Sequence, residues 1–291
     1  RTLDTIMITC ALLMTFGIVV AFLIGPLALD ENNGAGSFSA QITSGSLVFS
    51  LLVQAASLRL LTADQLLRDR EFNAGVLIAP YYLGKLLGNY AEACLYAFAF
   101  LVGYYPFLKA RAPFIMYWYV FFLLHLAVSG LVNFIAVLLP GTGKGTFVVG
   151  AVVLLWSFGG ISPPISVMED SMSTFAVILN YLSPFKYSFT VEVINELSQY
   201  PMIWNVESLY SKLGYQVSDR NRSVSALVIY FVVSNLCAYI YAEFQQLSPK
   251  LWKDTQEKLN VASGGWLFMS RSEHRTKEFL ARCSAAASSV S

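Results

Sequence analysis

The polar residues that could do chemistry are few, and they lie far apart in the sequence. Only two histidines occur, His125 and His274, and no cluster of His, Cys, Asp and Glu has the spacing of a zinc site. Ser129 follows His125 by one helical turn, but a serine protease built into the membrane would need its histidine on a later helix. We therefore expect no catalytic residue and no metal ligand in this chain.

The segment from Gly141 to Thr146 has the composition of a phosphate-binding loop but not its pattern. That loop requires a Gly five residues before its Gly-Lys pair and a Ser or Thr directly after the Lys. Leu138 and Gly145 occupy these two positions. The segment is therefore interpreted as a tight turn that carries the positive charge of Lys144.

The composition places these few polar residues in an apolar chain. Of the 291 residues, 56% are hydrophobic and 13% are charged, with a net charge of +1. A soluble chain carries roughly 45–50% apolar and about 25% charged residues. This composition excludes a disordered protein, and without a basic domain nothing indicates nucleic-acid binding. An integral membrane protein is therefore predicted.

Six apolar segments reach the length of about 20 residues that a helix needs to cross a bilayer. We expect an all-α membrane protein with spans at about residues 5–24, 42–61, 81–105, 114–139, 146–165 and 224–244. Of the 19 Lys and Arg residues, 13 fall on the side of both termini, which predicts cytoplasmic termini. The membrane domain would be 1–246 and a partly disordered cytoplasmic tail 247–291, with the plasma membrane favoured.

The connection between the second and third spans carries helix signals. Thr62 and Gln65 have the spacing of a capping box, and Asp64 and Arg68 have that of an i,i+4 ion pair. A short cytoplasmic helix is therefore expected over residues 62–72, at the membrane surface.

The long connection at residues 166–223 is expected on the outer side. Its apolar run Phe175–Leu182 is too short to span and predicts a re-entrant or interfacial segment. Ser183 and Pro184 have the types typical of the N-cap and first residue of a further helix. The apolar residues of that helix recur every four positions and predict a face that packs on the bundle: Phe185, Phe189, Val193 and Leu197.

Glu92 is the clearest ionisable residue within a predicted span, and Asn89 lies one turn before it. Ionisable side chains are costly within the membrane and indicate function by default. The pair predicts a polar relay or part of a substrate path. The alternative is a Glu that pairs with a neighbouring helix or is kept protonated by burial.

The order of these features resembles the membrane domain of an ABC transporter of the G subfamily, the white and pleiotropic-drug-resistance type with the type-2 exporter fold. The resemblance covers roughly residues 1–246. It is carried by Arg68-Asp69-Arg70-Glu71 with Gly75 and Tyr81-Tyr82-Leu83-Gly84-Lys85, by Phe158-Gly159-Gly160, and by Tyr181-Leu182-Ser183-Pro184-Phe185-Lys186-Tyr187 with Ile194-Asn195-Glu196.

The resemblance implies roles for several residues. Substrate would pass between the second and fifth spans of two halves, which points to Phe49, Val53, Leu155, Trp156 and Phe158. The helix at 62–72 would couple to a nucleotide-binding domain through Arg68, Asp69, Arg70 and Glu71. The signature of the last outer loop would comprise Ser183, Pro184, Phe185, Tyr187, Asn195 and Glu196.

The resemblance also implies partners and an energy source. The 291 residues contain no Walker motif, so ATP and magnesium are expected on a nucleotide-binding domain, in cis upstream or in trans. Because the sequence starts at Arg1 without a Met, a fragment of a longer transporter is expected. Its function would be export of lipid-like or amphipathic substrates by alternating access, as a homo- or heterodimer in membrane lipid. The alternative is a secondary transporter or channel-like protein that uses Glu92 as a proton or ion site.

Overall fold

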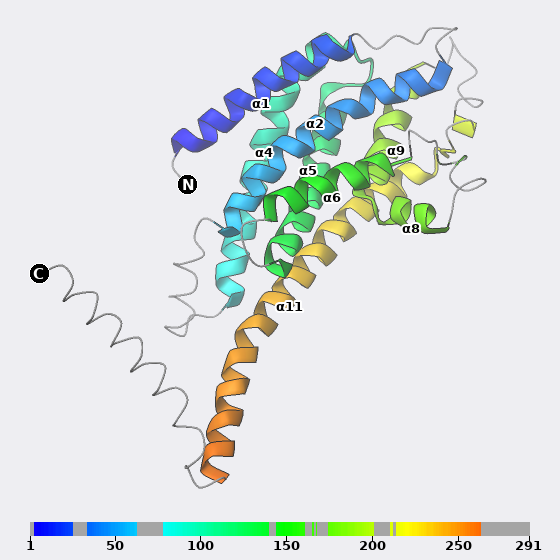
Figure 1. Ribbon diagram of the computed structural model, residues 1–291. Helices are drawn as coiled ribbons and strands as arrows, with labels where there is room; N and C mark the ends of the chain where they lie inside the picture. Colours follow the sequence, from blue (N-terminus) through cyan, green and yellow to red (C-terminus); the bar gives the residue numbers. More distant parts are fainter. Residues whose placement is uncertain are drawn as a thin grey trace, which may run out of the picture. The chain divides into compact units, whose positions relative to one another are not determined.

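A computed structural model describes residues 3–25, 34–62, 78–139, 144–160, 165, 167, 174–200, 210–211 and 214–262. No strand occurs in these ranges, so the predicted all-α class is confirmed for the described part of the chain. Its helices, shown in Figure 1, are α1 (Leu3–Ile24), α2 (Gly34–Thr62), α4 (Ile78–Leu108), α5 (Phe114–Leu138), α6 (Lys144–Ser157), α8 (Thr174–Leu182), α9 (Pro184–Leu197) and α11 (Asp219–Ala262).

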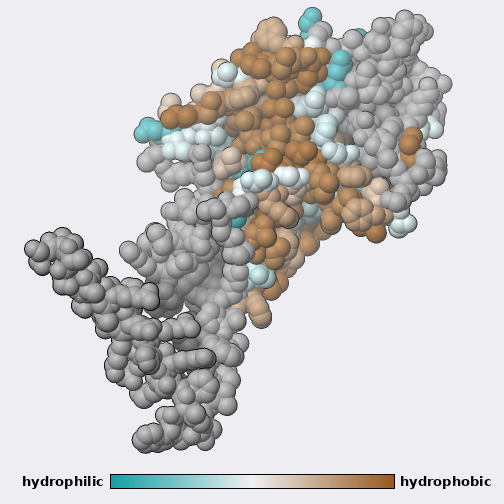
Figure 2. All heavy atoms as spheres, viewed as in Figure 1, coloured by the Kyte–Doolittle hydropathy of each residue, from teal (hydrophilic) through white to brown (hydrophobic). Residues whose placement is uncertain are grey.

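Four helical segments are long and apolar enough to cross a membrane. They are Leu3–Ile24, Ala79–Leu108, Phe114–Leu138 and Asp219–Phe244. The large exposed apolar side chains on these segments, including Leu23 on α1 and Ile229 on α11, give the described part of the chain extensive apolar surface (brown in Figure 2). Soluble monomers rarely expose apolar patches of this extent, so the chain is a multi-pass integral membrane protein.

The second and fifth predicted spans differ from these four. The described side chains of α2 over Thr43–Leu58 form an apolar stretch that includes five buried polar residues: Thr43, Ser46, Ser50, Gln54 and Ser57. The fifth span was expected over 146–165, but α6 ends at Ser157 and has only 14 residues, about 21 Å. Gly159 and Gly160 follow, and the positive φ of Gly160, 91°, is incompatible with a continuing helix. The six-span topology and its orientation stay predictions.

The chain divides into two compact units, residues 1–240 and 241–291. The first unit holds α1 to α9 and the first half of α11. In the second unit, the described residues are the continuation of α11 through Ala262. The predicted disordered end of the tail lies outside the described residues.

Within the first unit, α1 and α4 approach each other backbone to backbone. A Cβ added to Gly17 would lie 2.5 Å from the carbonyl oxygen of Phe100, and one added to Gly103 would overlap the carbonyl oxygen of Met14. Small residues permit such close approach between membrane helices. The two glycines are therefore requirements of this crossing.

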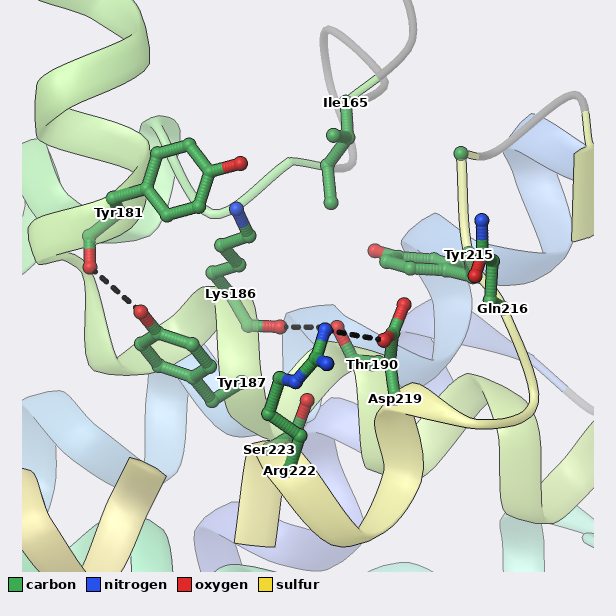
Figure 3. A pocket seen from close by; sticks show the side chains of 11 residues that line it. Ile165, Tyr181, Lys186, Tyr187, Thr190, Tyr215, Gln216, Asp219, Arg222 and Ser223 are labelled. Atoms are coloured by element: carbon green, nitrogen blue, oxygen red, sulfur yellow. Dashed lines mark hydrogen bonds and ion pairs between the residues drawn. The ribbon is translucent and has the colours of Figure 1, made fainter. Parts of the chain in front are cut away.

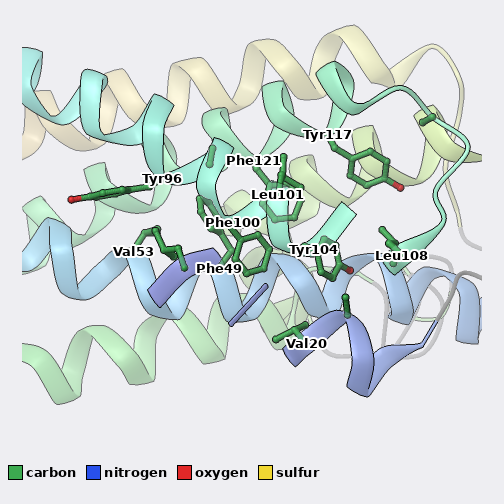
Figure 4. Packing of buried hydrophobic residues seen from close by; sticks show 14 of the residues in the cluster. Val20, Phe49, Val53, Tyr96, Phe100, Leu101, Tyr104, Leu108, Tyr117 and Phe121 are labelled. Carbon is green, nitrogen blue, oxygen red and sulfur yellow. The ribbon is translucent and has the colours of Figure 1, made fainter. Parts of the chain in front are cut away.

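An aromatic core joins α2, α4 and α5 (Figure 4). The ring of Phe49 lies 5.2 Å from the rings of Phe100 and Phe121, and Phe100 stacks on Tyr104 at 5.4 Å. Figure 4 shows these side chains pointing into the same space between the helices. The second, third and fourth predicted spans thus share one core within a single chain.

Candidate functional site

The N-terminus of α9 is fixed as the sequence predicts. The Ser183 hydroxyl accepts a hydrogen bond from the Phe185 amide at 3.2 Å, and Pro184 is the first helical residue. The same hydroxyl donates to the Leu155 carbonyl oxygen at 2.7 Å. The predicted cap is therefore confirmed, and it also binds α9 to the last turn of α6.

The turn after α6 completes this junction. Asn180, on α8, donates its Nδ2 to the Phe158 carbonyl oxygen at 2.7 Å. A Cβ on Gly159 would come within 2.5 Å of the Phe189 ring. The Phe158-Gly159-Gly160 motif therefore ends α6 and leaves room for α9 to pack directly against that end.

The predicted apolar face of α9 is confirmed, since Phe185, Phe189, Val193 and Leu197 are all buried. The helix is nevertheless buried on nearly all sides, and a polar row runs beside the apolar one. Ser188, Glu192 and Glu196 recur every four residues in this row and are buried as well.

Glu192 lies inside the protein and was not predicted as a site residue from the sequence. Its carboxylate accepts hydrogen bonds from the Ser46 hydroxyl of α2 at 2.9 and 3.0 Å and from the Ser188 hydroxyl at 2.6 Å. Burial raises the pKa of Glu192 to about 8, while the two serine hydrogen bonds oppose the rise. The four-residue spacing from Ser188 to Glu196 is the signal that could have found it.

Glu196 fixes the connection between α4 and α5. Its carboxylate accepts hydrogen bonds from the backbone amides of Arg111 at 2.7 Å and Ala112 at 3.0 Å, and from the Tyr117 hydroxyl at 3.0 Å. The Arg111 guanidinium lies 4.2 Å from the centre of the Tyr200 ring. The acidic residue of the predicted signature thus holds a connection 84 residues away in the sequence.

Tyr187 and Asn195, two further residues of the predicted signature, make contacts different from those of Ser183 and Glu196. The Tyr187 hydroxyl donates to the Tyr181 carbonyl oxygen at 2.9 Å, which ties α9 to α8. Asn195 is buried, and its Oδ1 accepts no hydrogen bond from the described residues. Among the described residues, the signature therefore acts as a packing unit around α9.

The two residues of the predicted polar relay point to different partners. Asn89 is buried and donates its Nδ2 to the Ser129 hydroxyl of α5 at 2.9 Å. Glu92 is half-buried and accepts a hydrogen bond from the Tyr96 hydroxyl of its own helix at 3.3 Å. Asn89 therefore links two helices, and a relay through Glu92 stays a prediction.

A second polar cluster escaped the sequence analysis. Asn235 of α11 accepts hydrogen bonds at Oδ1 from the Tyr82 hydroxyl at 3.2 Å and from Asn133 Nδ2 at 3.0 Å. Its own Nδ2 donates to the Phe231 carbonyl oxygen. The cluster joins α4, α5 and α11 in the apolar interior, where hydrogen bonds between helices are typical of membrane proteins.

The residues predicted to line a substrate path fall into two groups. Phe49 and Val53 are 0% and 1% exposed and pack in the aromatic core. Leu155 is buried, while Trp156 and Phe158 are half-buried. The Trp156 indole N–H reaches the Thr43 carbonyl oxygen at 3.4 Å, so α2 and α6 do meet. Contact of any of the five with substrate stays a prediction.

The predicted coupling residues, Arg68, Asp69, Arg70 and Glu71, lie outside the described residues. Among the residues described, no group of three or more His, Cys, Asp and Glu is arranged to hold a metal ion.

Comparison with known proteins identifies the family of this chain. No curated protein matches the chain. The family described as ABC-2 type transporter matches residues 4–197, from the first turn of α1 to the end of α9. The match covers more than half of the chain and ends with the helix that Glu192 and Glu196 hold in place. The chain therefore belongs to the ABC-2 type transporter family, as a membrane component.

Proposed function

We propose that the chain is the membrane-spanning part of an ATP-driven exporter of the G subfamily, which moves lipid-like or amphipathic substrates by alternating access. The observation that carries the proposal is the ABC-2 family match over residues 4–197. Within that family, the resemblance of the outer-loop signature to the G subfamily supports the choice of this subfamily. The exporter would work as a homo- or heterodimer with a second transmembrane half.

The contacts of α9 support a role in transmitting movement. One short helix is bound to α2 through Glu192, to α6 through Ser183 and to the α4–α5 connection through Glu196. Elements tied in this way shift together, because polar contacts in a dry interior are costly to break. A rocking motion of either half would therefore move α2, α6 and α9 as one body.

Membrane domains of this family typically pair with a nucleotide-binding domain. The sequence has no Walker motif, so ATP and magnesium would bind that domain and not this chain. In the proposal, Arg68, Asp69, Arg70 and Glu71 contact the domain through the connection between α2 and α4. The chain itself would supply the path, the gate and the coupling surface.

The proposed substrate class rests on those residues of the predicted path that are not fully buried. Phe49 and Val53 pack inside one chain, so Trp156 and Phe158, both half-buried, are the better candidates for substrate contact among the five. Both side chains are aromatic, and aromatic surface suits apolar or amphipathic cargo.

The proposal is tested by the energy source of transport. The protein is reconstituted with its nucleotide-binding domain in vesicles, and export of a fluorescent phospholipid analogue and of an amphipathic dye is measured with ATP, without ATP and with a proton gradient. Export that requires ATP and persists in Glu92→Gln supports the proposal. Tyr96→Phe, which removes the hydroxyl that donates to Glu92 and leaves the Glu92 carboxyl in place, is the matched control.

The alternative function predicts the reverse result. A proton-coupled secondary transporter would run on the gradient without ATP and would stop when Glu92→Gln removes the titrating group. That outcome would overturn ATP-driven export by this chain.

A further inference from the structure

Glu192 places a carboxyl group in the interior of the protein beside neutral partners. The residue is 2% exposed, and its hydrogen bonds are those with the Ser46 hydroxyl of α2 and the Ser188 hydroxyl of α9. No Lys, Arg or His in the described ranges forms an ion pair with it. An unpaired ionised carboxylate is costly in such surroundings, and a buried acid usually takes up a proton instead.

The titratable groups nearest to Glu192 supply no positive charge. Three tyrosines from neighbouring elements lie close enough to interact with it electrostatically: Tyr104 of α4, Tyr117 of α5 and Tyr215 before α11. Glu196 lies one turn further along α9 and adds a like charge. The described side chains of α2 and α8 include no charged residue.

The cationic and imidazole groups on the helices around Glu192 contact other residues. The Lys144 ammonium group of α6 donates to a carbonyl oxygen of α5 at 2.7 Å. The His125 ring of α5 lies 6.0 Å from aromatic rings of α2 and α4. Lys186, in the first turn of α9, lies 3.3 Å from the centre of the Tyr181 ring. Compensation of the Glu192 carboxyl group is therefore left to a proton.

The two serine contacts suit the protonated form of Glu192. A carboxylate has about four sites that accept hydrogen bonds, and two hydroxyls supply at most two donors. In the protonated acid, Oε1 accepts from the Ser188 hydroxyl at 2.6 Å, while Oε2 carries the proton and donates it to Ser46 Oγ at 3.0 Å. Each carboxyl oxygen then has a partner, and no charge is buried.

The contact between Ser46 and Glu192 lies where α2, α6 and α9 meet. It joins α2 to α9 across 146 positions of the sequence. About one turn before Ser46, the Thr43 carbonyl oxygen of α2 accepts a hydrogen bond from the Trp156 indole N–H of α6 at 3.4 Å. A change at Glu192 would therefore act on the two helices that carry the predicted substrate path.

A pocket near Glu192 gives a released proton a route to water. The pocket has a volume of about 300 Å³ and lies beside α9 and the start of α11 (Figure 3). Its lining includes Thr190, two residues before Glu192, and the exposed side chain of Arg222. Tyr215 lines the pocket as well and interacts electrostatically with Glu192. Tyr215 therefore borders both the pocket and the surroundings of the acid.

We propose that Glu192 is a proton-binding site, and that its bound proton holds α2 against α9. On release, the Oε2–H bond breaks, the proton passes to water, and the carboxylate keeps the electron pair. The donor to Ser46 is then lost and a charge is left in the interior, so the joint between the two helices loosens and admits water. An effect on transport would rest on the proposed function, whereas the proton site itself does not.

The first measurement detects the proton directly. Infrared spectra of the purified full chain in detergent, in a sodium-free N-methylglucamine buffer, report the carbonyl stretch of protonated carboxylic acids. At pH 6 we expect a band that is lost in Glu192→Gln and retained in Asp4→Asn, which replaces an exposed carboxylate. The band should disappear as the pH rises through about 8.

The second measurement follows the joint by amide hydrogen exchange. In Glu192→Gln the side-chain amide has one acceptor oxygen and an N–H donor, as the protonated acid does, so the joint should stay closed at every pH. Comparing the two chains at the same pH removes the intrinsic pH dependence of exchange. From pH 6 to pH 7, protection of α9 should fall about tenfold in the native chain relative to Glu192→Gln, while that of α1 should not differ.

Ser46→Ala tests the partner of the acid and leaves Glu192 in place. The Ser46 hydroxyl donates to the ionised form, so its removal should move the midpoint of the infrared titration to higher pH. Ser57→Ala is the matched control. It removes a hydroxyl from another buried serine of α2, one that donates to the Val53 carbonyl oxygen at 3.2 Å, and should leave the midpoint unchanged.

Three results would overturn the proposal in different ways. If no infrared band at pH 6 depends on Glu192, the residue is ionised and binds no proton. If sodium in place of N-methylglucamine abolishes the band at pH 6, the ligand is a monovalent metal cation. If the band titrates but α9 exchanges equally in both chains, the proton does not hold the joint. None of these measurements uses ATP or export, so they succeed or fail independently of the proposed function.

Discussion

At the scale of single residues, the two buried carboxylates of α9 have different surroundings. Glu196 accepts hydrogen bonds from two backbone amides and a tyrosine hydroxyl, whereas Glu192 accepts them from two serine hydroxyls among the described residues. Neutral hydroxyls compensate burial of a charge less well than a set that includes several fixed amides. The pKa of Glu192 is accordingly raised to about 8 from an ordinary value of 4.5.

This raised pKa predicts that the protein loses stability as the pH rises from about 4.5 to about 8. The folded state holds the Glu192 proton more tightly than the unfolded state, so the contribution is fully present below pH 4.5 and is lost as the pH rises to about 8. Between pH 6 and pH 8 the loss would reach about 2 kcal/mol. Thermal unfolding in detergent at several pH values measures it.

Glu192→Gln should remove most of this pH dependence, since the amide keeps an oxygen acceptor and cannot ionise. Asp4→Asn, an exposed carboxylate in the first turn of α1, is the control and should retain it. Equal slopes for the native chain and Glu192→Gln would show that another group titrates in this range.

The proposed coupling contact makes a second prediction at this scale. Arg68→Glu and Arg70→Glu each reverse a charge that would face the nucleotide-binding domain, so each should uncouple ATP hydrolysis from export while leaving expression intact. Both rates are measured in the same vesicles. Arg220→Glu reverses a charge on an exposed turn of α11 and should preserve coupling. Full coupling in both Arg68→Glu and Arg70→Glu would contradict the assignment.

At the scale of elements, the sequence predicted those helix ends that depend on hydrogen bonds between neighbouring residues. Ser183 and Pro184 predicted the start of α9 because a cap involves only adjacent residues. The hydrogen bond between Ser46 and Glu192 joins residues 146 positions apart, and no spacing rule reveals it. The early end of α6 is accompanied by a positive φ at Gly160. Glycine permits a positive φ but does not require one, so the sequence alone does not predict this end.

The crossing of α1 and α4 predicts that alanine substitutions at two glycines of α4 change the stability of the protein in opposite directions. Gly103→Ala should destabilise the protein by about 1–3 kcal/mol, because the new methyl group overlaps the Met14 carbonyl and forces the helices apart. Gly88→Ala, also on α4, meets no atom within 4 Å and should stabilise it by up to about 1 kcal/mol through helix propensity. Thermal midpoints of the two variants measure both effects. Equal shifts would show that the helices do not cross at Gly103.

At the scale of the whole molecule, the shortage of charge determines the class of protein but not the number of crossings. Four described segments are long enough to span, and α2 and α6 are the two that decide between four and six. Polar groups of both helices form hydrogen bonds within the protein. On α2, the Ser46 hydroxyl donates to Glu192, and near the end of α6, the Leu155 carbonyl oxygen accepts from Ser183. Internal pairing allows a less apolar helix to lie within a membrane, so we retain the prediction of six spans.

The side on which two connections lie distinguishes the topologies. With six spans and cytoplasmic termini, the α4–α5 connection lies outside and the α5–α6 connection inside; with four spans both positions reverse. In a chain whose four cysteines are replaced by Ala, Pro113→Cys and Thr142→Cys are labelled in intact cells with a membrane-impermeant maleimide. We expect Pro113→Cys, an exposed position, to react and Thr142→Cys to react only after permeabilisation. If a tag at the C-terminus is accessible only after permeabilisation, the reverse pattern would mean that α2 and α6 do not cross the membrane, and the proposed substrate path between them would be wrong.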